Sequence, residues 1–186
     1  MWWKYIIFGA LMVFVISWLI AVIQKRIVCE IYEACGMGCF LTLISLGWSW
    51  TRLGILLLKI VGLVLYAPAV LFVAGSFIAL RTKGKPEDSW ERTTKLIDTG
   101  VFQVTRHPMY FGTAIWTVGV MFCQQSIPSL ILGLVAMFCF FMASKGEDKF
   151  NLEKFGDEYR EFMTKVPMWN ILAGLANLQK TRIDDE

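Results

Sequence analysis

The sequence predicts an all-α protein, a polytopic membrane helix bundle with about five transmembrane helices. Apolar residues make up 56% of the 186 residues and charged residues only 18%, whereas a soluble domain carries about 25% charged residues. The apolar residues gather in five long runs, and clusters of basic residues follow the first, third and fifth of them. The formal net charge of +3 is small and dispersed, so it does not favour nucleic acid as a partner.

The first apolar run extends from Trp2 to Ile23 and is interrupted only by Lys4. It is too long for the apolar centre of a signal peptide, which has about 7–15 residues, and no small-residue cleavage pattern follows it. We therefore expect a first membrane span, ended by Lys25 and Arg26.

The second run, Ala34 to Trp50, is at the short end of the range for a spanning helix, about 17–25 residues. Its end carries Trp48 and Trp50, which suit the membrane interface. We expect a second span; the alternative interpretation is a re-entrant or interfacial segment.

The third run, Leu53 to Leu80, is long enough to cross a bilayer with some tilt. Pro68 is expected to kink this helix. Glycines 54, 62 and 75 would allow close contacts with neighbouring helices.

A polar, basic loop from Arg81 to Thr105 precedes the last two apolar runs, Pro108 to Cys123 and Ile127 to Ser144. Only residues 124–126 separate these two runs. So short a connection predicts an antiparallel helical hairpin.

The basic clusters decide the predicted topology. Lys25 and Arg26, the loop after Leu80 and the tail after Ser144 should all face the cytoplasm. This holds only if the second and third runs both cross the membrane. We therefore expect five spans, with the N-terminus outside and the C-terminus in the cytoplasm.

The chain after residue 144 has the composition of a surface segment. Apolar residues recur at helical spacing between charged ones from Gly146 to Lys165, which predicts an amphipathic helix ended by Pro167. Trp169 to Leu178 is expected to form a second interfacial helix, and residues 180–186 to be frayed.

The cysteines and the single histidine argue against a metal site. None of the five cysteines forms a Cys-x-x-Cys motif, and reduced, buried thiols are expected. With one histidine, a zinc site is not expected either.

The segment Thr99–Gly112 lies at the boundary between the polar loop and the fourth apolar run, and it contains the strongest candidate site residues. His107, the only histidine, precedes Pro108, which suits the first turn of a helix. The backbone N–H groups of residues 109–111 would carry the positive end of the helix dipole. Beside Arg106, this helix start predicts a site for an anionic group.

A pair of acidic residues, Glu147 and Asp148, follows the last apolar run. The predicted hairpin brings this pair beside residues 106–110. Adjacent carboxylates on a helix diverge by about 100°, which suits the wrapping of a cation better than an acid/base dyad. An anion site next to a cation site fits a zwitterion with an added positive centre, and S-adenosylmethionine is such a molecule.

The C-terminal half resembles the isoprenylcysteine carboxyl methyltransferase and phospholipid methyltransferase family of membrane enzymes. The resemblance covers residues 96–167 and rests on four motifs in order. They are Gly100-Val101-Phe102, Arg106-His107-Pro108-Met109-Tyr110-Phe111-Gly112, Glu147-Asp148 and Phe155-Gly156-Asp157-Glu158-Tyr159.

The resemblance implies an S-adenosylmethionine-dependent methyltransferase with these residues around its cofactor. The residues that it implies for catalysis are Arg106, His107 and Tyr110, and those for cofactor binding are Gly100, Phe102, His107, Pro108, Met109, Tyr110, Gly112, Glu147 and Asp148. Two residues depart from the family's pattern. Asp148 replaces a glutamate and reaches one methylene less far, and Phe102 replaces a tyrosine, which affects local packing.

The resemblance also implies a lipophilic methyl acceptor, either an isoprenylcysteine-like carboxylate or a phospholipid amine. A carboxylate needs no general base, whereas an amine must first be deprotonated, and His107 would be the candidate base. We expect membrane lipids and a lipid-modified or lipophilic substrate as partners, without nucleic acid or metal. Residues 1–80 would form the first three spans, and residues 81–186 a catalytic region facing the cytoplasm.

Other interpretations stay open from the sequence alone. In the alternative interpretation of each residue, His107 only caps its helix and Arg106 snorkels to a lipid phosphate. Tyr110 then belongs to an aromatic belt, and the acidic pair is a solvated helix start. For the whole chain, the alternatives are a membrane reductase using NADPH and a non-catalytic scaffold. Sterol-reductase-like enzymes carry a similar Arg-His-Pro-Asn-Tyr run. This sequence has Met109 at the position of the asparagine.

Overall fold

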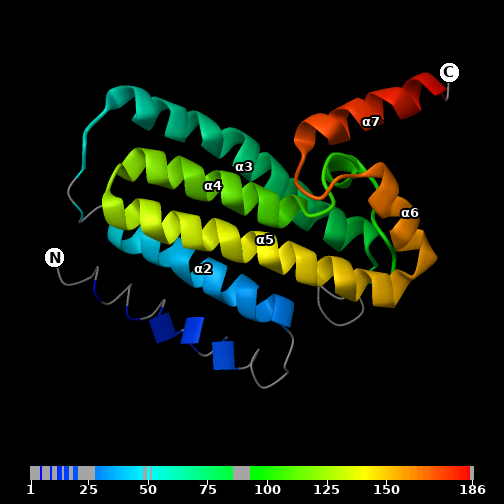
Figure 1. Cartoon of the computed structure of the whole chain (residues 1–186), viewed down its shortest axis with the longest axis horizontal. Helices are drawn as coiled ribbons and strands as arrows, with labels where there is room; N and C mark the ends of the chain where they lie inside the picture. Colours follow the sequence, from blue (N-terminus) through cyan, green and yellow to red (C-terminus); the bar gives the residue numbers. More distant parts are fainter. Residues whose placement is uncertain are drawn as a thin grey trace. The chain divides into compact units, whose positions relative to one another are not determined.

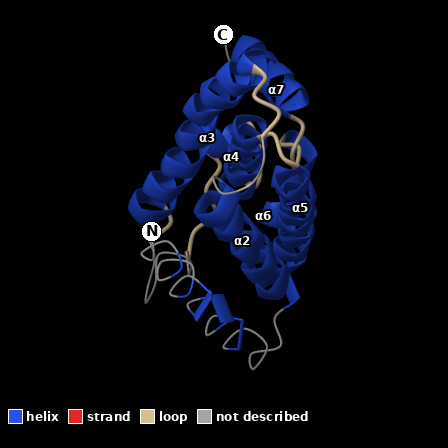
Figure 2. Cartoon of the chain, turned by 90° about the vertical axis from the view of Figure 1, so that its left-hand side faces the viewer, coloured by secondary structure: helices blue, strands red, loops and turns tan. Residues whose placement is uncertain are grey.

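The computed structural model describes residues 5, 9, 12, 13, 15, 16, 19, 20, 28–47, 50, 52–85 and 93–184, and their regular structure is helical (Figure 2). In chain order the elements are α2 (Val28–Leu46), α3 (Leu56–Lys83), the 3-10 helix η2 (Gly100–Gln103), α4 (Pro108–Gln124), α5 (Ile127–Phe155), α6 (Asp157–Lys165) and α7 (Ile171–Asp184) (Figure 1). The predicted first span, Trp2–Ile23, and the basic pair after it lie largely outside the described residues.

Three described helices are long and apolar enough to cross a membrane: residues 29–46 of α2, all of α3 and α5. Helix α4 has 17 residues, which is the lower limit for a spanning helix. The all-α membrane bundle predicted from composition is therefore confirmed. The count of five spans stays a prediction.

The helices that follow the apolar runs differ from the predictions at their polar ends. Helix α2 begins at Val28, six residues before the predicted Ala34, and ends at Leu46 rather than Trp50. Helix α3 includes Arg81 and Lys83, which were expected in the loop, and contains Pro68 in its interior. A change in polarity marks where a helix leaves an apolar environment, and it does not end the backbone hydrogen bonding.

The same reason explains the largest difference, at the end of α5. This helix continues through the polar residues after Ser144 and ends only at Phe155. Gly156, with φ of +57°, stops it, because few residues other than glycine adopt that backbone conformation readily. The predicted single amphipathic helix over 146–165 is therefore two helices, the end of α5 and α6.

The last two helices, α6 and α7, have 9 and 14 residues. Helix α6 ends at Lys165, two residues before Pro167, as the proline predicts. Helix α7 continues to Asp184, so residues 180–184 are helical where fraying was expected.

The chain forms two compact units. The first comprises residues 1–69 and 113–146. Its helices approach closely at glycines: a Cβ on Gly36 would lie 2.9 Å from the Phe140 ring, and one on Gly62 would lie 2.5 Å from the Gly119 carbonyl oxygen. Small residues at helix contacts are the usual means of close packing in membranes.

The second unit comprises residues 70–112 and 147–186. Its core is a cluster of Tyr159, Phe162 and Val166, which has Leu96, Phe102, Leu152, Phe155 and Met163 packed against it. Each compact unit thus combines parts of the predicted regions 1–80 and 81–186, and that division stays a prediction.

Candidate functional site

The second unit holds the start of α4 firmly in place. Helix α4 begins at Pro108, as predicted, and the Phe111 amide donates to the His107 carbonyl oxygen over 3.0 Å. Just before it, the Arg106 amide donates to the Pro167 carbonyl oxygen over 3.1 Å, and the Thr105 hydroxyl donates to that of Met168. Residues 105–107 are therefore fixed against the segment that follows α6.

One carboxylate, that of Asp148 on α5, gathers three donors. The guanidinium of Arg106 binds it through both oxygens, Nε to Oδ1 at 3.3 Å and Nη2 to Oδ2 at 2.9 Å. His107 Nε2 lies 2.7 Å from Oδ1, and the Tyr159 hydroxyl donates to the same oxygen over 2.6 Å. A buried carboxylate is tolerated when it is paired and hydrogen-bonded in this way.

Arg106 also connects this carboxylate to the end of α6. Its Nη1 donates to the carbonyl oxygens of Met163, at 3.2 Å, and of Val166, at 2.8 Å. Carbonyl groups at the C-terminal end of a helix lack intrahelical partners and carry partial negative charge. The guanidinium satisfies them and the Asp148 carboxylate at the same time.

His107 lies between both members of the acidic pair. Its Nε2 contacts Asp148, and its Nδ1 lies 3.5 Å from Glu147 Oε2. The histidine is buried, and burial alone would lower its pKa. Hydrogen bonds and charge attraction from the two carboxylates outweigh that effect and raise the pKa of His107 to about 9. The imidazole is therefore protonated at neutral pH, with both N–H groups directed at acids.

The same contacts shift the pKa of the partners. Burial raises the pKa of Asp148, but hydrogen bonds from His107, Tyr159 and Arg106 and the charge of His107 lower it to about 2. The pKa of Tyr159 is raised, first by burial and then by its hydrogen bond to Asp148. Asp148 is thus a carboxylate and Tyr159 a neutral donor across the physiological range.

The acidic pair was expected to wrap a cationic ligand, and in the structure its internal partner is the His107 ring. Binding of a ligand by this pair stays a prediction. Asp148 is buried, with internal partners on both oxygens. The side chain of Glu147 is 40% exposed. Of the two acids, Glu147 is the one that a ligand can reach.

These contacts contradict three of the alternative interpretations. The Arg106 side chain is 10% exposed and paired, so it does not snorkel. The His107 ring binds carboxylates and does not cap α4 with its side chain. The acidic pair lies within α5, not at a helix start.

The glycine turn forms η2, at residues 100–103. Gly100 has φ of +65°, a conformation that favours glycine. The next residue, Val101, lies against Gly75 of α3, where a Cβ would be 2.9 Å from the valine side chain. Phe102 packs on the Tyr159 cluster, which agrees with the packing role expected for its replacement of tyrosine.

The remaining predicted residues lie on the first turns of α4. The ring centroids of Tyr110 and His107 are 6.2 Å apart. Pro108 and Gly112 are buried, and Met109 is partly buried. The fold therefore brings Arg106, His107, Glu147 and Asp148 into direct contact and places Tyr110 beside them. Roles in catalysis and cofactor binding stay predictions for all of these residues.

Tyr159 is the member of the cluster that was not predicted as a site residue. It belongs to the Phe-Gly-x-x-Tyr motif, which resembled the family's pattern without an assigned role. Its distance from Asp148, 11 residues, would equal three turns of one continuous helix. The break at Gly156 removes that simple relation, so the hydrogen bond was not readable from spacing.

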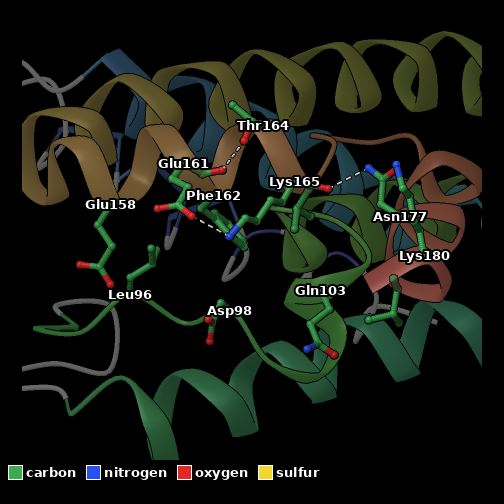
Figure 3. Close-up of a pocket in the computed structure, with 12 residues that line it drawn as sticks. Leu96, Asp98, Gln103, Glu158, Glu161, Phe162, Thr164, Lys165, Asn177 and Lys180 are labelled. Atoms are coloured by element: carbon green, nitrogen blue, oxygen red, sulfur yellow. Dashed lines mark hydrogen bonds and ion pairs between the residues drawn. The ribbon is translucent and has the colours of Figure 1, made fainter. Parts of the chain in front are cut away.

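A cleft of about 570 Å³ lies against α6, and Phe162 and Val166 of the Tyr159 cluster are among its lining residues (Figure 3). It is lined by Leu96, Asp98, Gln103, Glu158, Glu161, Phe162, Thr164, Lys165, Val166, Asn177, Leu178 and Lys180. Within it, Lys165 Nζ pairs with Glu161 Oε1 at 2.7 Å. None of the ten predicted site residues lines this cleft.

Comparisons with known proteins agree with the motif resemblance. The family model described as phospholipid methyltransferase matches residues 57–158, more than half of the chain. This chain belongs to the phospholipid methyltransferase family. The matched residues include α4, α5 and the contacting residues Arg106, His107, Glu147 and Asp148, and they end one residue before Tyr159.

Curated relatives of this family member transfer methyl groups to oxygen and sulfur. Protein-S-isoprenylcysteine O-methyltransferase B of Arabidopsis thaliana is 30% identical over 64% of this chain and 58% of its own length. The Saccharomyces cerevisiae protein-S-isoprenylcysteine O-methyltransferase is 32% identical over 48% of this chain and 40% of its own length. Methanethiol S-methyltransferase of Pseudomonas deceptionensis is 26% identical over 88% of this chain and 56% of its own length.

The chain therefore spans about half the length of the curated relatives it matches. No solved structure is a significant match.

The Tyr159 hydroxyl is expected to stabilise this family member through the Asp148 carboxylate. Tyr159→Phe removes one charge-assisted hydrogen bond and leaves the packing unchanged, so we expect a loss of about 1.5–3 kcal/mol in unfolding free energy. Chemical unfolding of the purified protein in detergent measures it. Tyr5→Phe, at a side chain that is 69% exposed, is the matched control. Equal stabilities of the two variants would contradict the role assigned to Tyr159.

The pH dependence of stability should carry the signature of the His107–Asp148 pair. The folded pKa of His107, about 9, lies above its usual 6.5, so its contribution is complete below pH 6.5 and is lost as the pH rises through 9. The folded pKa of Asp148, about 2, lies below its usual 3.8, so its contribution is present above pH 3.8 and is lost as the pH falls through 2.

Thermal unfolding of the wild type and of His107→Gln between pH 6 and pH 10 tests the alkaline part. The wild type should lose on the order of 3 kcal/mol more than the variant over this range. Groups other than His107 titrate equally in both proteins and cancel in the difference. Parallel pH profiles would show that His107 is not held as an imidazolium.

Proposed function

We propose that this chain is an S-adenosylmethionine-dependent methyltransferase that acts on a lipophilic substrate in the membrane. One observation carries the proposal: Arg106 and His107, from the helix-start motif, meet Glu147 and Asp148 in a single ion cluster. Family membership supports methyl transfer, and the apolar helices of the chain support an acceptor that arrives from the lipid.

The chemistry of the residues fits the proposed cofactor. Glu147, half-exposed beside the buried cluster, would bind the ammonium group of the methionine part. The N-terminal end of α4, at Pro108 and Met109, would favour its carboxylate. Gly100, Phe102, Tyr110 and Gly112 would complete the cofactor pocket. When bound, the cofactor supplies a sulfonium methyl group, which is a strong electrophile.

Asp148 takes a positioning role in this proposal, refining its assignment as a cofactor ligand. Both of its oxygens are occupied by Arg106, His107 and Tyr159. Its carboxylate would therefore act through His107, whose ring it holds against Glu147. The shorter aspartate fits this role, because a glutamate would push the carboxylate one methylene further into the cluster.

The state of His107 narrows the choice of acceptor. With both ring nitrogens directed at carboxylates, the imidazolium has no lone pair to take a proton. The base that an amine acceptor would need is then missing at this position. We therefore propose an acceptor that is already anionic, a carboxylate or a thiolate. Its lone pair forms the bond to the methyl carbon while the carbon–sulfur bond breaks, leaving an ester or thioether and a neutral sulfide.

We also propose the orientation that the charge pattern predicts. The last turn of α3 carries Arg81 and Lys83, and the last turn of α5 carries Lys154. Basic residues beside a span favour the cytoplasmic side. The cofactor would then enter from the cytoplasm. Residues 81–186 would supply the chemistry and residues 1–80 membrane spans.

Cofactor binding is the direct test of this proposal. Glu147→Gln should weaken the binding of S-adenosylhomocysteine about tenfold or more, because a charge-assisted hydrogen bond contributes about 1.5–3 kcal/mol. Titration calorimetry in detergent measures the affinity. Glu153→Gln, on the same helix and without an assigned role, is the control. Unchanged binding in both Glu147→Gln and His107→Ala would end the proposal.

The melting temperature of the purified protein with different ligands distinguishes the remaining function classes. A ligand that binds the folded state raises the melting temperature. S-adenosylhomocysteine should raise it and NADPH should not. The reverse result would indicate the reductase, and no response to either would indicate a scaffold.

The proposed acceptor class makes a separate prediction about rate. With a lipophilic carboxylate or thiol and labelled S-adenosylmethionine, kcat should not depend on a group of pKa 6–7, since His107 stays protonated. A long-chain amine of equal hydrophobicity should be methylated at least about a hundredfold more slowly, the range lost with a general base. Faster methylation of the amine, with a rate that falls as the pH is lowered, would contradict the proposed class.

A further inference from the structure

The first compact unit contains a second cleft, of about 720 Å³, that shares no residue with the candidate site. It lies where the segment before α3 meets the end of α4 and the start of α5. Its lining residues are Trp50, Arg52, Leu53, Leu58, Met121, Phe122, Gln125, Ser126, Ile127, Pro128, Ser129 and Leu130. The residues that form this cleft come from both sides of the α4–α5 turn.

Gln125 gives this cleft a fixed backbone wall. Its carbonyl oxygen accepts from the Leu53 amide at 3.2 Å. Its side chain pairs with Ile55 in both directions, accepting from the amide at 2.7 Å and donating to the carbonyl oxygen at 2.8 Å. The α4–α5 turn and the segment before α3 are thereby joined by three hydrogen bonds.

The two serines of the cleft are also engaged with each other. The Ser126 amide donates to the Ser129 hydroxyl oxygen at 3.2 Å, and the Ser129 amide donates to the Ser126 hydroxyl oxygen at 3.3 Å. The Ser129 hydroxyl in turn donates to the Ser126 carbonyl oxygen at 2.7 Å. These contacts cap the start of α5 and use the serine groups internally.

What remains for a ligand is an apolar wall with a single charged residue at its edge. Leu53 and Ile127 are 77% and 76% exposed, and Leu130 is 50% exposed. Arg52 is exposed and is the one charged residue among the lining residues. Arginine presents a planar fork of donors that matches a phosphate. Apolar surface next to such a cation has the chemistry of the boundary between lipid tails and headgroups.

We propose that this cleft binds one membrane glycerophospholipid, with its phosphate on Arg52 and the first part of an acyl chain on the wall formed by Leu53, Ile127 and Leu130. The charge complementarity at Arg52 selects a phosphate-bearing lipid, and the apolar wall selects a lipid over free phosphate. The site is separate from the proposed methyl-transfer site and does not depend on that activity.

Native mass spectrometry of the full chain, released from detergent with added lipid, tests the proposal. The wild type should retain phosphatidylglycerol at least about tenfold better than Arg52→Gln does, the factor expected for a charge-assisted contact. Arg81→Gln, an exposed arginine at the end of α3, is the matched control and should bind like the wild type. Ile127→Ser should weaken retention more than Leu134→Ser, which alters an exposed leucine that does not line the cleft.

Two further probes decide between lipid and other ligands. Diacylglycerol of the same chain length, which lacks the phosphate, should be retained no better by the wild type than by Arg52→Gln. Inorganic phosphate at millimolar concentration should not displace the lipid. Equal retention of phosphatidylglycerol by Arg52→Gln and the wild type, or displacement by inorganic phosphate alone, would overturn the proposal.

Discussion

The carboxylate of Asp148 is the constraint on which the second compact unit depends. A buried charge is expensive unless opposite charges and hydrogen bonds surround it. Here the start of α4 supplies Arg106 and His107, and α6 supplies Tyr159. Removing any one donor leaves the carboxylate underpaired, so the position of each of these elements fixes the others.

This constraint also settles which chemical states are present at the site. Two basic side chains, Arg106 and His107, face the two members of the acidic pair, and His107 and Asp148 each favour the charged form of the other. Such a cluster holds charges in place and does not release a proton easily. It suits the methyl transfer proposed above, whose demands are alignment and exclusion of water.

Different interactions stabilise the first unit. Its helices approach at glycines, and leucines, isoleucines and valines are exposed on its surface, as expected for side chains that face lipid. Polar contacts gather at the turn around Gln125, where backbone groups leave the helices and need partners. A membrane bundle of this kind places its specific polar chemistry at helix ends, and both sites proposed for this protein lie there.

The sequence by itself determined the all-α membrane class, the helix start at Pro108, the hairpin of α4 and α5, and the meeting of residues 106–107 with residues 147–148. Hydropathy, the stiffness of proline and a three-residue turn are local properties, so a linear reading captures them. Only the tertiary structure decided that α5 continues to Phe155 and that Tyr159 joins the cluster. It also decided that His107 lies between the two members of the acidic pair. Those outcomes depend on the break at Gly156 and on competition among buried charges, and both are settled by packing in three dimensions.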